Sequence, residues 1–243
     1  MAITEYFVRY LQRRDQLGAK DIDRLRAIRT THQSFGPGEV IVPKGVIADR
    51  SCMMLRGMSA RQHDLASRPG ERVITALHVP GDFVDLHGFV LAGLEHDVVS
   101  LGLSEVEFVD HDELRDITQN FPHLTRLLWM STVIDASIHR QWLVASASLR
   151  SSGHLAHLFC EIYTRLASIG AARDHSFTLP LLQKELAGIL GYTPIHINRA
   201  VRDLRDSRLI RWVGQEVQIL DWVGLARIGR FDPVYLELDR IRR

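Results

Sequence analysis

The stretch from residue 179 to residue 219 constrains this chain more than any other, because it has the pattern of two short helices around a tight turn, followed by a hairpin. We predict the first helix at about Gln183–Leu190, where leucine and alanine recur at helical spacing. Gly191 can end that helix in the left-handed conformation. Thr193 can cap the second helix with its hydroxyl, and Pro194 falls at the first helical position, where its missing N–H costs nothing. This order predicts a winged helix-turn-helix.

The second helix divides into an apolar face and a polar face. Its register places four apolar side chains on one side: Ile197, Ala200, Val201 and Leu204. The opposite side carries Ile195, Arg199 and Arg202. Arginine can bridge guanine, asparagine can bridge adenine and an apolar side chain can touch the thymine methyl group, so this face suits the major groove of double-stranded DNA. The predicted DNA contacts are Lys184, Thr193, Pro194, Ile195, His196, Asn198, Arg199 and Arg202.

Arginines continue along and beyond this helix, although the whole chain carries a net charge of only +1. They recur at every third position: Arg199, Arg202, Arg205, Arg208 and Arg211. Such a run suits DNA phosphates, and an exposed helix whose arginines are merely solvated is the alternative. The apolar segments 209–212 and 217–220 flank Gly214 and predict the hairpin of the wing.

The composition is that of an ordinary globular protein, with 46% hydrophobic and 24% charged residues among 243. There is no apolar run of about eighteen residues and no basic-then-apolar leader, so we expect a cytoplasmic protein with no membrane partner. Cys52 and Cys160 are the only cysteines and lie far apart. This usage argues against a disulfide framework, a zinc ribbon or a four-cysteine iron-sulfur site.

The N-terminal half has a different character. A helical segment gives way at about Thr30 to short apolar runs separated by glycines, such as 39–42, 52–55, 73–79 and 98–103. That spacing predicts an antiparallel barrel or roll, similar to a jelly roll or cupin. The fold class is therefore α+β: an N-terminal β-roll, a long helix and a C-terminal winged helix-turn-helix.

The long helix begins at Pro122 and extends to about residue 150. Apolar and small residues approximate a heptad seam, which we predict to be a dimer interface: Leu124, Leu127, Ser131, Ile134, Ile138, Gln141 and Ala145. The same helix can pack under the β-roll, against a second copy, or both, and we favour both. A hinge is expected in the small-residue stretch 146–153, which gives three domains at 1–115, 116–150 and 151–243.

The roll, the long helix and the winged helix in this order resemble the CRP/FNR family of bacterial transcription regulators over nearly the whole chain. Residues 80–83, Pro-Gly-Asp-Phe, look like the turn that precedes the family's ligand-binding segment, and residues 188–210 resemble its recognition region. The resemblance implies a homodimer that binds a palindromic operator, regulates transcription and contacts RNA polymerase. It also implies that the β-roll is a sensor of a small molecule, or that its pocket is vestigial.

Departures from the family pattern restrict which ligands the β-roll is expected to bind. Where cyclic-nucleotide-binding members carry a Gly-Glu pair and then an Arg-Ser pair, this chain has Asp85, Leu86 and His87, followed by His96 and Asp97. These five residues form the predicted ligand pocket. Without the arginine, a buried cyclic phosphate lacks compensation for its desolvation, so we expect no tight binding of cyclic AMP or cyclic GMP.

Two further departures concern the iron-sulfur branch and the recognition helix. No cysteine precedes Cys52, so the iron-sulfur chemistry of the oxygen-sensing branch is not expected, and no cofactor is predicted. Pro194 and Ile195 replace the Arg-Glu pair with which many members read bases, so the target sequence should differ. Leu182 stands where members often have a capping Thr or Ser, and Lys184 can supply the missing phosphate contact.

The chain has twelve histidines, and several fall in or near the sensor: His78, His87, His96, His111 and His123. We interpret them as ordinary surface or hydrogen-bonded histidines rather than as metal or haem ligands, because no tight ligand pair accompanies them. No nucleophile motif, phosphate loop or paired-carboxylate spacing is present, so we expect no enzymatic activity. The remaining alternative is a ligand-binding or scaffold protein whose winged helix binds protein instead of DNA.

Overall fold

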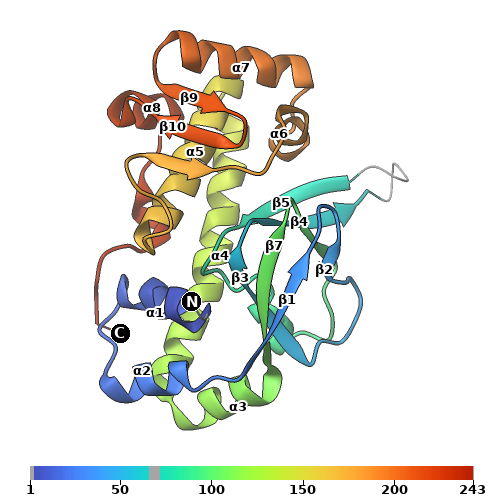
Figure 1. The fold of residues 1–243 in the computed structure, drawn as a ribbon, viewed down its shortest axis with the longest axis vertical. Helices are drawn as coiled ribbons and strands as arrows, with labels where there is room; N and C mark the ends of the chain where they lie inside the picture. Colours follow the sequence, from blue (N-terminus) through green and yellow to red (C-terminus); the bar gives the residue numbers. More distant parts are fainter. Residues whose placement is uncertain (1–2, 66–71, 243) are drawn as a thin grey trace. The chain divides into compact units, whose positions relative to one another are not determined.

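The computed structural model describes residues 3–65 and 72–242 (Figure 1). The chain divides into two compact units. The first contains Met1–Ala136 and also the C-terminal tail Glu237–Arg243, and the second contains Ser137–Leu236.

The first unit begins with helices α1 (Ile3–Gln12) and α2 (Ala19–Arg26) and continues into two antiparallel sheets. The strands are β1 (Thr30–Phe35), β2 (Val40–Val42), β3 (Arg50–Arg56), β4 (Ser59–Asp64), β5 (Arg72–His78), β6 (Asp97–Ser100) and β7 (Ser104–Asp110). One sheet has the order β1-β7-β3 and the other has the order β2-β6-β4-β5. The predicted change of pattern at Thr30 is confirmed, because β1 begins there; the sheets form a roll rather than a closed barrel.

The core of the roll contains apolar side chains from both sheets. Its buried members are Ile41, Val42, Cys52, Met54, Val84, Leu94, Val98, Val106 and Phe108. Residues 80–83 connect β5 to this core through a tight turn, in which Gly81 adopts a left-handed φ of 91°. The N–H of Gly81 donates to Met54 O at 2.9 Å, and the N–H of Met54 donates to Asp82 O at 3.0 Å. The turn is thereby attached to β3, and it leads into the short 3-10 helix η1 (Leu86–Phe89).

Helix α3 (His111–Asn120) follows the sheets, and α4 (Pro122–Ser148) then runs for 27 residues. Most of the stripe predicted to be the dimer seam is buried within the single chain: Leu124, Leu127, Ile134, Ile138 and Ala145. Ser131 and Gln141 are half-buried. A second chain is therefore not needed to cover this stripe. The large apolar side chains that α4 leaves exposed are instead Trp129, Val133, Leu143 and Val144.

The second unit begins within α4 and contains the predicted winged helix-turn-helix. Its further helices are α5 (Ser151–Ser168), α6 (Gln183–Leu190), α7 (Pro194–Asp206), α8 (Trp222–Gly229) and the 3-10 helix η2 (Pro233–Leu236). Three short strands, β8 (Ser176–Thr178), β9 (Ile210–Val213) and β10 (Glu216–Ile219), pair in the order β8-β10-β9. The break between α4 and α5 lies within the stretch in which a hinge was predicted.

Glu161 on α5 is fully buried and is the centre of a polar network in the second unit. Its carboxylate forms an ion pair with Arg165 at 3.1 Å and accepts hydrogen bonds from Tyr235 Oη at 2.8 Å and from Trp142 Nε1 at 3.3 Å. Because a buried carboxylate is costly unless paired and hydrogen-bonded, these contacts hold the end of α4, α5 and η2 in one arrangement.

The C-terminal tail packs in the first unit. The N–H of Ile241 donates to Arg14 O at 3.0 Å, and Arg240 Nε donates to Asp15 O at 3.2 Å. Arg14 is itself buried, with its guanidinium 3.8 Å from the centre of the Tyr10 ring. No helix among the described residues combines the length and the apolar character that crossing a bilayer requires.

Candidate nucleic-acid interface and sensor pocket

Helices α6 and α7 enclose the tight turn that the sequence predicted. α6 spans Gln183–Leu190, as expected, and Gly191 ends it with a left-handed φ of 72°. The Thr193 hydroxyl accepts a hydrogen bond from the N–H of His196 at 3.4 Å, and Pro194 occupies the first turn of α7. Both helix boundaries are therefore confirmed, and the caps fix the register of α7.

The two faces of α7 are also confirmed. The apolar side is buried, through Ile197, Ala200, Val201 and Leu204. The predicted reading side is exposed at every position: Thr193, Pro194, Ile195, His196, Asn198, Arg199 and Arg202. Ile195 is 72% exposed, so its side chain is free to contact a partner. The side chain of Lys184 lies outside the described part of the structure.

One arginine of the predicted phosphate-binding run has a structural contact instead. Arg205 Nη2 donates a hydrogen bond to the carbonyl oxygen of Trp212 on β9, and Trp212 Nε1 donates to Gly214 O at 2.9 Å. Arg205 therefore attaches the wing to α7. Sequence spacing could not separate it from Arg202 and Arg208, because its partner is a backbone carbonyl.

The wing is the hairpin of β9 and β10, and each of the four strand boundaries lies one residue from the predicted one. Gly214 and Gln215 form its tip, and Gly214 has a φ of 60°. The strand β8, which precedes α6 in the chain and pairs with β10, was not predicted from the sequence. A strand of three residues, in which only Phe177 is apolar, is too short to show a periodic pattern, and its partner β10 lies about forty residues away.

The five residues of the predicted ligand pocket fall into two groups in the first unit. Asp85 and Leu86 are buried beside β3, where Asp85 Oδ1 accepts a hydrogen bond from the N–H of Cys52 at 2.6 Å. His96 is buried at the start of β6, and Asp97 Oδ1 accepts from the N–H of Lys44 at 2.7 Å. The ring of His87, in η1, has its centre 5.7 Å from that of His96. The acidic side chains of this set thus make backbone contacts in the roll.

Arg61 on β4 was not among the predicted site residues, although it is the buried cation of this region. Its Nη2 atom pairs with Asp135 of α4 at 3.1 Å and donates to Val84 O at 3.4 Å. Burial, followed by the positive charge of Arg61, lowers the pKa of His96 to about 4, so that its imidazole is neutral at neutral pH.

Asp85 should make the stability of the protein depend on pH. Burial raises the pKa of its carboxyl to about 7, although the hydrogen bond from Cys52 and the charges of Arg61 and Arg50 act in the opposite direction. Between about pH 4 and pH 7 the folded state then retains a proton that the unfolded state has released. The free energy of unfolding should fall as pH rises through this window, by up to about 1.4 kcal/mol per pH unit.

Urea unfolding of the wild type and of Asp85→Asn at pH 5 and pH 8 measures this effect. The asparagine keeps an oxygen for the N–H of Cys52 but cannot ionise, so the difference in stability between the two proteins should shift towards the variant at pH 8. An identical difference at both pH values would show that Asp85 does not retain its proton in the folded state.

Comparisons with known proteins agree with this architecture. Residues 153–228 match the family described as the Crp-like helix-turn-helix domain. The transcriptional regulatory protein btr of Bordetella pertussis is 26% identical over 164 residues, which span 68% of this chain and 67% of that protein. The transcriptional activator protein FnrA of Stutzerimonas stutzeri is 22% identical over 213 residues, or 88% of this chain and 86% of that protein. The structure of FixK2 from Bradyrhizobium japonicum shares the fold with a TM-score of 0.72 at 19% identity, covering 83% of this chain and 98% of that one.

The fold of two antiparallel sheets, a long helix and a winged helix-turn-helix is thus shared along most of the chain, and the DNA-binding domain is matched separately. The exposed face of α7 has the chemistry that such a domain requires. The chain is therefore a DNA-binding transcription regulator with a Crp-like helix-turn-helix domain, and along most of its length it is similar to regulators of the CRP/FNR family.

Proposed function

We propose that this regulator acts as a homodimer that binds a palindromic DNA site, with one α7 helix in the major groove of each half-site. The observation that carries this proposal is the uninterrupted exposure of the polar face of α7, whose register is fixed by Thr193 and Pro194. Asn198 and Arg199 would contact base edges, Ile195 would contact a thymine methyl group, and Arg202 would contact a phosphate. Thr193, Pro194, His196 and Lys184 would lie at the edge of the groove.

The dimer interface is proposed to lie on the exposed stripe of α4 rather than on the buried one. Positions 129, 133, 136, 140, 143 and 147 follow alternating steps of four and three residues, which is the heptad spacing of a coiled-coil seam. Trp129, Val133 and Leu143 are exposed large apolar side chains on this seam. A second copy of α4 would cover them, because a parallel or antiparallel helix pair buries the a and d positions of both partners.

The remaining parts of the proposal concern location and partners. Because relatives such as FnrA are transcriptional activators, we place the protein in the cytoplasm and propose contact with RNA polymerase at its DNA site. The roll is proposed to bind neither cyclic AMP nor cyclic GMP, because its buried arginine, Arg61, already pairs with Asp135. An iron-sulfur cluster is not proposed, since both cysteines are buried and Cys52 lies in the core of the roll.

Selection of bound sequences from a random duplex pool by the purified protein, at near-physiological salt, tests the proposal. We expect a palindrome whose half-sites are centred about 34 Å apart, which is one turn of DNA. Affinity for the selected duplex should exceed affinity for random duplex by at least about 1000-fold. Recovery of no common sequence, with equal affinity for all duplexes, would contradict sequence-specific binding.

Arg199→Ala separates base reading from phosphate contact. On the selected duplex this variant should lose about 1 to 3 kcal/mol of binding free energy, because one bidentate contact to a base is removed. On random duplex its affinity should change little, and repeated selection should show a relaxed preference at one position of each half-site. An equal loss on both duplexes would assign Arg199 to the phosphate backbone.

A further inference from the structure

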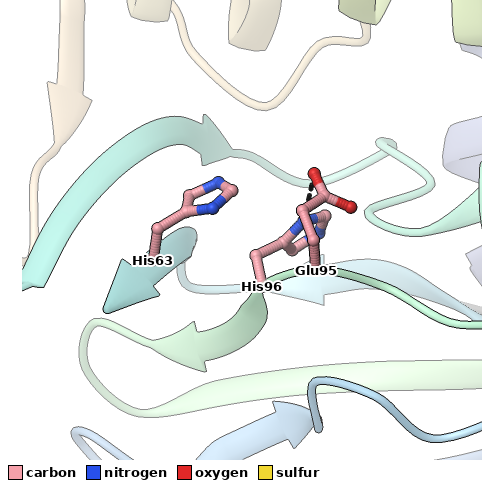
Figure 2. Close-up of side chains that lie close together, drawn as sticks. All are labelled: His63, Glu95 and His96. Carbon is pink, nitrogen blue, oxygen red and sulfur yellow. Dashed lines mark ion pairs between the residues drawn. The ribbon is translucent and has the colours of Figure 1, made fainter. Parts of the chain in front are cut away.

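The β-roll brings His63 together with Glu95 and His96, which lie more than thirty residues further along the chain. His63 lies on β4, and Glu95 and His96 directly precede β6 (Figure 2). β4 and β6 are antiparallel neighbours in a register that pairs Gln62 with Asp97. One step further along the same register, His63 lies opposite His96, and their ring centres are 5.2 Å apart.

The three side chains converge closely enough to share one ion. One donor atom from each of His63, Glu95 and His96 lies within 4.8 Å of the donor atoms of the other two. Figure 2 shows the Glu95 carboxylate over the His96 ring and the His63 ring extending towards both from the neighbouring strand. A tetrahedral ion about 2.1 Å from each donor separates its donors by about 3.4 Å, so a closure of up to about 1.4 Å would complete the site.

His96 supplies a second, independent observation. Its side chain is only 1% exposed, and its Nε2 atom has no hydrogen-bond partner among the described residues. A buried polar atom without a partner costs free energy, and such atoms in native proteins are normally satisfied by the chain, by water or by an ion. The orphaned nitrogen therefore points to a ligand that the protein chain alone does not provide.

The neighbours of the cluster orient it as metal ligands are usually oriented. The His63 Nε2 atom is hydrogen-bonded to Thr75 Oγ1 at 3.1 Å, which leaves the other ring nitrogen for an ion. His96 Nδ1 lies 3.2 Å from Glu95 Oε1, so two of the three proposed ligands are already in contact. The nearest buried cation, Arg61, is paired with Asp135, so its charge is locally balanced.

We propose that His63, Glu95 and His96 form a binding site in the β-roll for a divalent transition-metal ion of the zinc type. Two imidazoles and one carboxylate are a nitrogen and oxygen donor set that suits Zn²⁺ and Co²⁺ better than Mg²⁺ or Ca²⁺, which prefer oxygen alone. Three protein ligands leave a fourth coordination position for water or an exchangeable small ligand. The site goes beyond the proposed function, because it does not depend on DNA binding.

Titration of the full-length, metal-stripped protein with Co²⁺ and with Zn²⁺ tests the proposal. We expect one equivalent of Co²⁺ to give the intense visible absorption of a tetrahedral site, and Zn²⁺ to displace it at equal stoichiometry. Saturation with Mg²⁺ should leave the Co²⁺ spectrum unchanged. Absence of the tetrahedral spectrum, or binding of more than one equivalent of Co²⁺ per chain with that spectrum, would overturn the assignment.

Variants identify the ligands. His63→Ala and Glu95→Gln should each weaken Co²⁺ binding by more than about 100-fold, since the loss of outer contacts alone costs up to about that much. His32→Ala is the matched control, because His32 pairs with Glu105 at 3.3 Å on the other sheet without a second histidine. Glu95 is largely exposed, so Glu95→Gln keeps the test valid even if changes at the buried His96 prevent folding. Binding that survives both variants, or that is lost with His32→Ala, would contradict the site.

The outcome is separable from that of the DNA selection. Metal binding is read from the Co²⁺ spectrum without DNA, and DNA binding by the metal-stripped protein is measured by itself. Loss of the spectrum in His63→Ala with unchanged DNA affinity would support the metal site while leaving the regulator's DNA contacts unaffected.

Discussion

Leu143→Asp is expected to convert the proposed dimer into a monomer and to weaken binding to a palindromic site by more than about 100-fold. Leu143 is 72% exposed on the second stripe of α4, and no described apolar neighbour covers most of its side chain. In a helix pair, an aspartate at this position would bury a carboxylate against its twin, with no opposite charge to compensate. Two half-sites held by one dimer bind more tightly than two separate monomers by roughly 100- to 10,000-fold, and this avidity would be lost.

Leu103→Asp is the matched control for this variant. Leu103 is 82% exposed in the loop before β7 and lies off the seam, so the same substitution there should change neither the mass in solution nor DNA affinity. Sedimentation velocity and operator titration measure both quantities. If Leu143→Asp still sediments as a dimer, the exposed stripe of α4 is not the interface.

Gly229→Ala is expected to destabilise the second unit by about 2 to 3 kcal/mol. A β-carbon at residue 229, the last residue of α8, would lie 2.6 Å from the backbone nitrogen of His157 and 2.9 Å from its Cα. These atoms belong to the backbone of α5, which cannot rotate away as a side chain can. The two helices must therefore separate, and overpacking of this kind typically costs about 1 to 3 kcal/mol.

The same substitution at Gly188 should have the opposite sign. Gly188 lies inside α6, is exposed, and has nothing within 4 Å of the place that a β-carbon would occupy. Alanine there should stabilise the protein by about 0.4 to 1 kcal/mol, because it restricts the unfolded chain and favours the helix. Thermal and urea unfolding of both variants provide the comparison, and a stabilised Gly229→Ala would show that α5 and α8 are not in backbone contact.

The sequence was most informative where structure is determined locally. The C-terminal end of α6 follows from Gly191, and the N-terminal end of α7 follows from Thr193 and Pro194. Each of these residues acts on backbone groups within one turn of itself. The apolar face of α7 follows in the same way from helical spacing. The family resemblance then placed these helices in a regulator, and its fold was confirmed.

The sequence did not resolve features that depend on distant segments. α4 carries two heptad stripes, and periodicity alone could not show that the chain itself buries Leu127 and Ile134 while it leaves Trp129 and Leu143 exposed. His63 and His96 likewise meet only because β4 pairs with β6 in one particular register. A shift of that register by one residue would place one of the histidines on the opposite face of the sheet.

The position of the C-terminal tail changes what a truncation would remove. The chain passes from the first compact unit to the second at residue 136 and returns at residue 237, so the DNA-binding unit is topologically an insertion rather than an appendage. Both of its ends are anchored, one by the continuous helix α4 and the other by the contacts of Arg240 and Ile241 with the loop after α1. Cleavage after Leu236 would therefore leave every predicted DNA contact in place. The second unit would then be connected to the first through α4 alone, instead of through α4 and the tail.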